Sequence, residues 1–307
     1  NGWLRPELEA LIDMISKGRL VSGFVRGGGQ EQLAAGVNPA FNRERFEEAH
    51  DLVVQAWTKE GPFRFEGTHY QNRVVNPWAV PLQKPYPRVW VPGVISKETI
   101  LWAAQQRYPY IALNTSIEST QNIWKIYDEE AERCGYTAGP ENRGYLQQMH
   151  VAETEEKAIE NARQFRWMQG EFTGLAHPSW AAPAGYSSPG NRRAFVEFSI
   201  GRRSNPRGLT TFEEQVEQGR IICGTPKTVI PKIRKVLEET RPSIYAVWGN
   251  DGTVSHPDAM DCIRLLGEEV FPAVREIGKE LGLDSPFETD APVHLNYSTD
   301  LKKSAAE

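Results

Sequence analysis

The chain has 307 residues, of which 39% are hydrophobic and 24% charged, a composition typical of globular proteins and unlike that of disordered or collagen-like chains. The 35 Lys and Arg residues against 40 Asp and Glu residues leave a formal net charge of −5. With a pI near 5.8 and no concentrated basic stripe, the sequence offers no electrostatic footprint for nucleic acid or an anionic membrane. At about 150 residues per domain, the length suits two small domains or one barrel-sized domain.

No apolar run reaches the roughly 18 to 20 residues of a membrane span, and residues 1–6 lack the apolar core of a signal peptide. We therefore expect a cytoplasmic protein with no membrane partner. The cysteines are far apart, odd in number and without CxxC spacing, which disfavours a disulfide framework and a zinc site; they are Cys134, Cys223 and Cys262. The burial preference of free cysteine predicts buried or neutral thiols at all three positions.

Short apolar runs alternate with segments of helical period along most of the chain, which is the pattern of parallel strands covered by helices. The first strand is predicted over Arg19–Val25, and it runs into the loop 26–29, where three glycines free the backbone for a tight turn. Asn38 and Pro39 then predict the start of a helix, as its cap and first residue. Buried positions at helical spacing follow over 46–57.

Four more strands are predicted further along the chain, at 89–91, 110–113, 145–151 and 244–248. Helical segments alternate with these strands. The helices are predicted to start at Ser96, at Thr154, at Thr225–Pro226, at about Pro257 and, for one helix, at a position before Ile123; the last helix runs towards Leu281. Five strands with intervening helices predict an α/β fold.

Between about residues 170 and 220 the helical period breaks down into a stretch rich in Gly, Pro, Ser and aromatic residues. A long irregular insertion inside an α/β domain is more often a functional lid than a spacer. We therefore expect one domain over residues 1–284, with this insertion at about 170–220. A C-terminal tail without regular period is expected over 285–307.

The segment 16–27, SKGRLVSGFVRG, closely resembles the bacterial luciferase-like flavin monooxygenases. The resemblance continues in several further pieces, which are Asn38-Pro39, 43–48 (RERFEE), 81–87 (PLQKPYP), 91–104, 224–226 (GTP) and, faintly, the last helix. These pieces follow the order of the family and together cover most of residues 5–280. The chain is therefore similar to this family over most of its length.

Members of that family are (β/α)8 barrels that bind reduced flavin at the carboxyl ends of the strands, so the resemblance implies a TIM barrel of the luciferase-like type. The predicted strands resemble the fourth to eighth βα units of the family, and we expect the first three units to be lacking. In the family, those units supply part of the substrate wall and a frequently important histidine.

The resemblance also implies a site for the flavin phosphate. A phosphate dianion needs backbone N–H groups, hydroxyls and a cation that can bond in a fork. Arg26, beside the flexible Gly27, matches a phosphate-contacting arginine of the family, Arg43 matches a second one, and Ser96 and Thr99 match its hydroxyl donors. The alternatives are a surface salt bridge for Arg26, a solvated ion pair with neighbouring glutamates for Arg43, and a plain helix cap for Ser96.

Other chemistry finds little support in the sequence. The triglycine lacks the final glycine of GxGxxG and no GxxxxGK[ST] is present, which disfavours a Rossmann dehydrogenase, and no histidine has a partner at metal-ligand spacing. His177, in the insertion, is a weak catalytic candidate, whereas His150 suits a hydrogen-bonded core histidine. Trp90 and Trp248 could flank a flavin ring, although barrel filling is the commoner role for such residues.

We therefore expect a flavin-dependent monooxygenase that uses reduced FMN and O2 to oxygenate a small organic substrate, with the flavin supplying the hard chemistry. Because reduced free FMN needs an electron donor, a separate flavin reductase is the expected partner, and the resemblance suggests a homo-oligomer. Two alternatives stay open. Relatives on the same barrel use the deazaflavin F420 for hydride transfer, and luciferase-like proteins can pair active with inactive chains, which allows a non-catalytic flavin-binding subunit.

Overall fold

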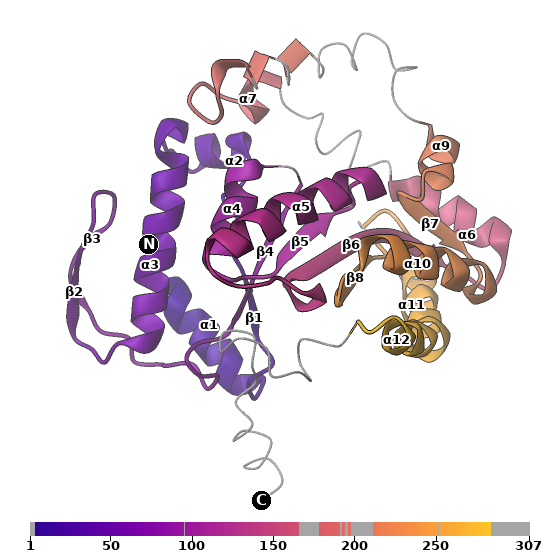
Figure 1. The fold of residues 1–307 in the computed structure, drawn as a ribbon, viewed down its shortest axis with the longest axis horizontal. Coiled ribbons are helices and arrows are strands. Elements are labelled where there is room, and N and C mark those ends of the chain that lie inside the picture. Colours follow the sequence, from indigo (N-terminus) through magenta and orange to yellow (C-terminus); the bar gives the residue numbers. More distant parts are fainter. Residues whose placement is uncertain are drawn as a thin grey trace, which may run out of the picture. The chain divides into compact units, whose positions relative to one another are not determined.

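The computed structural model describes most of the chain; the described residues are 4–94, 96–165, 178–190, 192–193, 196–197, 211–250 and 252–283. They fall into two compact units. The first unit takes the described residues of 1–91 and 179–196, and the second takes those of 92–178 and 197–285. In Figure 1 the sequence colouring makes the first unit mostly indigo and violet, and the second unit magenta to yellow.

The first unit is built around two parallel strands. β1 (Val21–Gly23) pairs with β4 (Arg88–Gly93), with Val21 opposite Arg88. The helical elements of this unit are α1 (Leu4–Ile15), α2 (Gly29–Ala34), the 3₁₀ turn η1 (Pro39–Phe41) and α3 (Asn42–Thr58). Asn38 is the cap of η1, since its side chain accepts the N–H of Ala40, so the predicted helix start is confirmed with a 3₁₀ turn ahead of α3.

β1 is shorter than the strand predicted over Arg19–Val25. Its ladder with β4 covers Val21–Gly23, and one further backbone bond, from the N–H of Phe24 to a β4 carbonyl (3.0 Å), extends it. The chain then turns away at Gly27, whose φ is +76°. The buried ring of Phe24 lies edge-on to that of Trp57 in α3, with centroids 6.2 Å apart, so packing anchors the end of β1.

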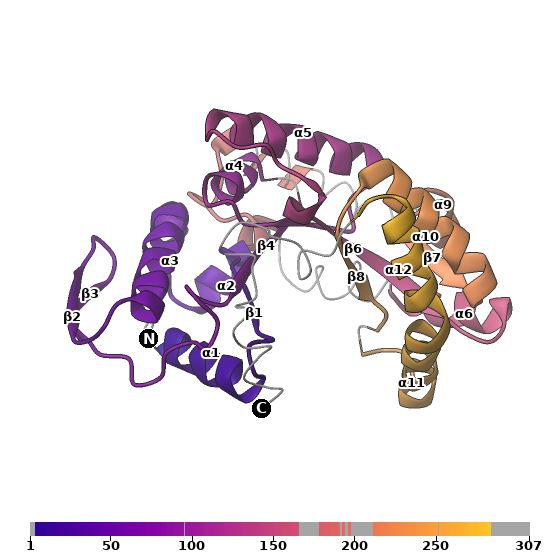
Figure 2. The same cartoon turned by 60° about the horizontal axis from the view of Figure 1, so that its bottom comes forward.

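An antiparallel hairpin of β2 (Phe63–Glu66) and β3 (Gln71–Val75) follows α3. Figure 2 shows it alongside α3, and residues of the helix and of both strands share one buried cluster, Leu52, Ala56, Phe65 and Val75. The carboxylate of Glu48 accepts the backbone N–H groups of residues 68–70 between the two strands. The hairpin is therefore held on α3 by apolar packing and by charge-assisted hydrogen bonds.

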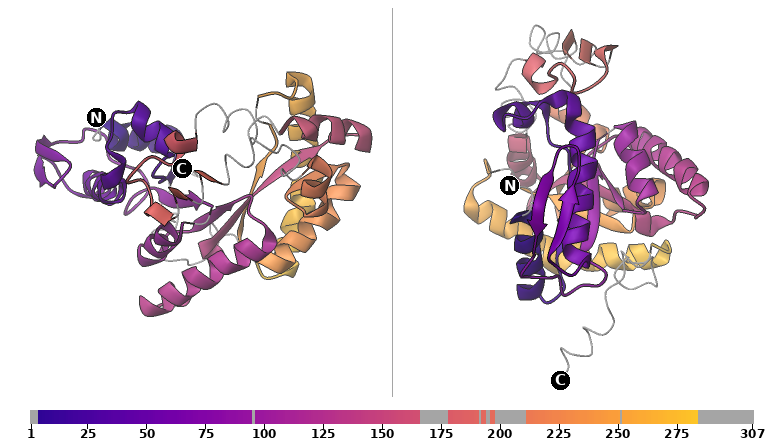
Figure 3. Two further views of the ribbon diagram at one scale, coloured as in Figure 1. Left: turned by 90° about the horizontal axis from the view of Figure 1, so that it is seen from above. Right: turned by 90° about the vertical axis from the view of Figure 1, so that its left-hand side faces the viewer.

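The second unit holds a parallel, curled sheet of half-barrel form. Its strands are β5 (Tyr110–Leu113), β6 (Arg143–Val151), β7 (Ile221–Gly224) and β8 (Ile244–Trp248). β6 is central, because its residues 143–146 pair with β5, 144–148 with β8 and 148–151 with β7. Figure 3 shows helices packed along this sheet.

The helices of the second unit are α4 (Lys97–Gln105), α5 (Ile117–Arg133), α6 (Glu155–Ala162), α9 (Phe212–Glu217), α10 (Pro226–Thr240), α11 (His256–Leu265) and α12 (Phe271–Glu280), with the short turns η2 (Pro140–Asn142), η3 (Arg163–Phe165) and η6 (Leu266–Val270). Local sequence explains their starts. The hydroxyl of Thr154 accepts the N–H of Lys157 at the start of α6, and Pro226 takes the first position of α10.

Among the described residues, no helix combines the length and the apolar character that crossing a bilayer requires.

The parallel α/β class is confirmed, and β5 and β8 have the predicted bounds. The count of five parallel strands was wrong, because β7 is a sixth. β7 has four residues and the neighbouring α9 has six, and elements this short do not establish a period in the sequence. The lack of the first three barrel units stays a prediction.

The expected burial of the cysteines holds for Cys223 and Cys262 and fails for Cys134, which is exposed. Cys134 is the C-cap residue of α5, a position outside the buried face of that helix. Burial raises the pKa of both the Cys223 and the Cys262 thiol, which keeps these groups neutral near pH 7.

Much of the predicted insertion, and residues 284–307 with the predicted tail, lie outside the described residues. The described part of the insertion includes α7 (Pro178–Ala181) and a turn in which Ala184 and Ser187 form an isolated bridge. It also includes α9, so part of the stretch predicted to be irregular is helical.

A carboxylate at the start of α6 holds the N-terminus of α10. Glu155 accepts the backbone N–H of Thr225 (3.0 Å), the Thr225 hydroxyl (2.9 Å) and the Thr228 hydroxyl. The hydrogen bonds from Thr228 and Thr225 keep the pKa of Glu155 below its ordinary value. Because the N-terminal end of a helix dipole is positive, the charged carboxylate suits this position and ties the two helices together.

Replacing Glu155 with Gln should lower the free energy of unfolding by about 1 kcal/mol at pH 7, because the amide keeps an acceptor but removes the charge at the helix N-terminus. A carboxyl with a lowered folded-state pKa stabilises the protein above its unfolded-state pKa, and this contribution is lost as the pH falls through the folded-state value. Urea unfolding should therefore show a smaller difference from wild type at about pH 4 than at pH 7. Glu156→Gln, in the same turn and exposed, is the matched control, and an equal loss at both pH values would contradict the assignment.

Candidate cofactor site

Arg26 follows β1 at the carboxyl end of that strand and is half-buried. The next residue, Gly27, has the left-handed φ of +76°, and a Cβ placed there would lie 3.1 Å from Oε2 of Glu31. Glu31, in the first turn of α2, accepts the backbone N–H of Gly28. The loop therefore turns sharply after Arg26 and is held against α2.

Two side chains from distant parts of the sequence contact the guanidinium of Arg26. Nη1 donates to Oδ1 of Asn42, the first residue of α3, over 2.6 Å. The ring centroid of Tyr186, in the described part of the insertion, lies 5.6 Å from Cζ of Arg26. The backbone carbonyl of Arg26 accepts Nε2 of the buried Gln32 (3.1 Å). Both the head group and the backbone of Arg26 are thus fixed by neighbouring elements.

Arg43 lies in the first turn of α3, directly after Asn42, and its side chain is 24% exposed. Its Nε lies 3.8 Å from Oε1 of Glu47, one turn along the helix, and its Cζ lies 5.9 Å from the ring centroid of Phe46. The ion pair with a neighbouring glutamate that the sequence allowed is therefore present, and an i,i+4 pair of this kind contributes little to stability. The position of Arg43 at a helix N-terminus also suits an anion.

Ser96 and Thr99 lie together in the second unit at the start of α4. Ser96 has the N-cap position, and its backbone carbonyl accepts the N–H of Thr99 (3.0 Å). Its hydroxyl does not cap the helix backbone: Oγ donates to Oε2 of Glu98 (3.2 Å) and accepts the Thr99 hydroxyl (3.1 Å). The prediction of Ser96 as the cap residue of this helix is therefore confirmed, but its hydroxyl bonds to the side chains of Glu98 and Thr99 instead of the helix backbone.

The predicted site residues thus form two groups. Arg26 and Arg43 both adjoin Asn42 in the first unit, with Gly27 in the loop beside them, and Ser96 and Thr99 adjoin one another in the second unit. Sequence reasoning missed Asn42, and it did not connect Tyr186 of the insertion with Arg26 and Gly27. No local pattern marks Tyr186, because its partners lie about 140 to 160 residues away along the chain.

His150 is fully buried in β6 and hydrogen-bonded, as predicted for a core histidine. Its Nδ1 lies 3.2 Å from the carbonyl oxygen of Gly249, and its Nε2 lies 3.0 Å from the side-chain nitrogen of Asn161. A carbonyl accepts and an amide NH2 donates, so these partners select the neutral imidazole with its proton on Nδ1. Burial lowers the pKa of His150.

The remaining candidates from the sequence are His177, Trp90 and Trp248. His177 lies outside the described residues, so its catalytic role stays a prediction. Trp90 lies in β4 and Trp248 ends β8, and both are half-buried. The indole N–H of Trp248 donates to the carbonyl of Asn250 (3.1 Å), which fixes the ring at the carboxyl end of β8. Within the described part of the chain, no three His, Cys, Asp or Glu side chains could together hold a metal ion.

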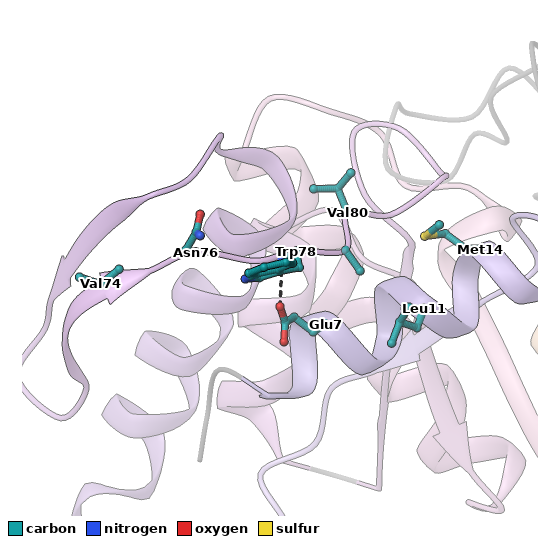
Figure 4. Close-up of a pocket in the computed structure, with 8 residues that line it drawn as sticks. Glu7, Leu11, Met14, Val74, Asn76, Trp78 and Val80 are labelled. Atoms are coloured by element: carbon teal, nitrogen blue, oxygen red, sulfur yellow. Dashed lines mark hydrogen bonds between the residues drawn. The ribbon is translucent and has the colours of Figure 1, made fainter.

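An open apolar pocket of about 720 Å³ lies elsewhere in the first unit, between α1 and the segment after β3 (Figure 4). Leu11 and Met14 of α1 line one side, and the backbone N–H of Trp78 donates to Oε1 of Glu7 (2.8 Å) across it. None of the predicted cofactor-binding residues is among the lining residues.

The parallel strands covered by helices define an α/β protein, and Arg26 with its glycine-rich loop follows the carboxyl end of one parallel strand, β1, which is the end where α/β barrels carry their sites. Comparison with known families makes the assignment specific. The chain belongs to the luciferase-like monooxygenase family, whose model matches residues 8–243. The resemblance noted in the sequence is therefore confirmed.

Solved structures of the same fold include enzymes with different cofactors. The oxygenating constituent of 3,6-diketocamphane monooxygenase from the CAM plasmid of Pseudomonas putida, in complex with FMN, has a TM-score of 0.67 and 16% identity, over 89% of this chain and 76% of that one. Monooxygenase RslO1 from Streptomyces bottropensis has a TM-score of 0.65 and 18% identity, over 89% and 74%. An F420-dependent secondary alcohol dehydrogenase has a TM-score of 0.61 and 16% identity, over 90% and 76%. At these identities the likeness establishes the fold alone.

His150 should remain neutral at pH 6.5 with its proton on Nδ1, because burial disfavours the charged ring and the two partners fit this tautomer. Long-range ¹H–¹⁵N NMR spectra recorded against pH would report both the tautomer and the pKa. Asn161→Asp should raise the pKa by at least about one unit, since a carboxylate favours imidazolium. A wild-type pKa at or above the ordinary value of about 6.5 would contradict the assignment.

Proposed function

We propose that this protein is a flavin-dependent monooxygenase that uses reduced FMN and O2 to oxygenate a small organic substrate. Its membership of the luciferase-like family supports oxidoreductase chemistry in general. The observation that carries the choice of a phosphate-bearing cofactor is the placement of Arg26, fixed by Asn42 at the carboxyl end of β1 beside the turn at Gly27.

The donor set of this site fits a phosphate group. Arg26 supplies a cation whose donors can bond in a fork, and Asn42 holds it through a neutral amide oxygen, which adds no negative charge beside the guanidinium. The side chain of Arg43 would contribute further positive potential. Ser96 and Thr99, in the second unit, stay separate candidates for hydroxyl donors to a phosphate.

Each group then has a defined task. Arg26, Gly27 and Arg43 would bind and orient the phosphate, and Ser96 and Thr99 are separate candidates for hydroxyl donors to the cofactor. Reduced FMN, when bound, would supply the electrons for oxygen activation. The protein contributes the fixed position of the cofactor, because an anchored phosphate restricts how the ring system can lie against a substrate. His177 remains the candidate for a group near that substrate.

An F420-dependent oxidoreductase is the second candidate. Two solved structures of this fold are described as F420-dependent, a secondary alcohol dehydrogenase and a tetrahydromethanopterin reductase from Methanopyrus kandleri. The two functions differ in a simple observable, since hydride transfer from F420 needs no O2. A non-catalytic flavin-binding subunit would bind the cofactor and turn over no substrate.

A separate flavin reductase as electron donor, a homo-oligomeric state and a cytoplasmic location are further parts of this proposal. The reductase follows from the need to supply reduced FMN as a free cofactor. Size-exclusion chromatography with light scattering would give the oligomeric state, and coupling the protein to a flavin reductase would be the condition for a substrate screen.

Arg26→Ala should weaken the binding of reduced FMN by about 10- to 100-fold, because a hydrogen bond to a charged group contributes about 1.5 to 3 kcal/mol. Anaerobic titration with reduced FMN, run beside reduced F420, measures this directly. The matched control is Arg45→Ala, which removes an arginine of the same helix as Arg43 whose guanidinium lies 5.0 Å from the ring of Tyr70 in the hairpin. Unchanged FMN affinity in Arg26→Ala would overturn the phosphate site, and a preference for F420 would move the protein to the second candidate.

A further inference from the structure

The amide of Asn42 joins three segments of the first unit. Its Oδ1 accepts Nη1 of Arg26 (2.6 Å), and its Nδ2 donates to the backbone carbonyls of Pro39 (2.5 Å) and Tyr186 (3.2 Å). These partners belong to the loop after β1, to the turn η1 and to the insertion. Asn42 is 7% exposed, so its amide group is itself largely shielded from water.

The orientation of this amide is fully determined by its partners. A carboxamide has two N–H donors on nitrogen and an acceptor on oxygen. Both N–H donors point to carbonyl oxygens, which cannot donate, and the oxygen faces a guanidinium, which cannot accept. A flipped amide would leave all three contacts mismatched, so Asn42 presents its oxygen to Arg26 in one fixed direction.

Tyr186 brings the insertion to the same loop. Its hydroxyl donates to the backbone carbonyl of Gly27 (2.9 Å), while its ring lies beside the guanidinium of Arg26. The preceding residue, Gly185, has a φ of +86°, and a Cβ there would lie 2.8 Å from Cα of Ala40. Only glycine allows this close approach of the insertion to η1, so the backbone of the insertion is seated against the elements that carry Asn42.

We propose that Asn42 and Tyr186 are positioning residues for Arg26, through which the insertion controls how tightly the site holds the phosphate of the cofactor. This inference rests on the proposed function. Asn42 orients the guanidinium without adding a negative charge. Tyr186 places its ring beside that guanidinium and donates its hydroxyl to the backbone carbonyl of the next residue, Gly27. The insertion, about 140 residues further along the chain, thereby becomes a structural part of the phosphate site.

The chemical choice of an amide at position 42 has a testable consequence. Aspartate has nearly the same shape and would keep an acceptor for Arg26, but it has no N–H for the carbonyls of Pro39 and Tyr186. It would also place a carboxylate beside the guanidinium and so oppose a phosphate dianion. A ligand without a phosphate would not feel that repulsion.

The experiment compares anaerobic binding of reduced FMN with that of reduced riboflavin, which has the same ring system and no phosphate. Asn42→Asp should weaken FMN binding by about tenfold or more and change riboflavin binding by less than about twofold. Tyr186→Phe, which keeps the ring and removes the bond to Gly27, should weaken FMN binding by about three- to tenfold, again with little effect on riboflavin. Tyr70→Phe is the matched control, because Tyr70 lies beside Arg45 in the hairpin and should leave both affinities unchanged.

Each outcome separates this inference from the proposed function. Arg26→Ala loses FMN affinity if the phosphate site is correct; if Asn42→Asp and Tyr186→Phe then keep wild-type FMN affinity, the positioning inference alone is wrong. A wild-type protein that binds riboflavin as tightly as FMN would overturn both. Equal losses for FMN and riboflavin in the variants would indicate general loosening of the unit and also overturn the inference. If Asn42→Asp fails to fold by circular dichroism, Tyr186→Phe and Tyr186→Leu decide the question.

Discussion

The hydrogen bond from Arg26 to the side-chain oxygen of Asn42 is the interaction on which the candidate site depends. It is short at 2.6 Å and directed by a buried amide whose two N–H groups are already committed to carbonyl oxygens. A flexible arginine side chain loses considerable rotamer freedom on binding an anion, and a guanidinium already held in place loses less of it at that moment. Under the proposed function, cofactor affinity would therefore depend on packing at the start of α3.

In the second unit the corresponding constraint is the crowding around β6, which pairs with three other strands. Gly144 leaves room there for Ile111 of β5, because a Cβ would lie 2.2 Å from its Cδ1 and that side chain would have to move. Next to it, Tyr145 stacks on Tyr245 of β8, with ring centroids 6.4 Å apart, and donates its hydroxyl to the carbonyl of Thr115 (2.7 Å). Burial raises the pKa of Tyr145 to about 12, so this tyrosine remains a neutral donor to the segment after β5.

Proteins that share this fold are described with different cofactors. Two solved structures with the same architecture are described in complex with FMN and with an F420 adduct, each at 16% identity to this chain. A shared barrel therefore does not select the cofactor, and the selection has to come from individual side chains at the strand ends. Arg26, Arg43 and the residues that hold them are the side chains through which this chain can express such a preference.

The sequence by itself determined the alternation of strands and helices, the family and the candidates Arg26 and Arg43, because these depend on local periodicity and on residues close together along the chain. The sequence did not reveal elements that are too short to show a period, such as β7. Only the tertiary structure decided that the amide of Asn42 meets Arg26, and that Tyr186 reaches the loop after β1. Such contacts join side chains through space, and no spacing along the chain encodes which donor will meet which acceptor once the backbone has folded.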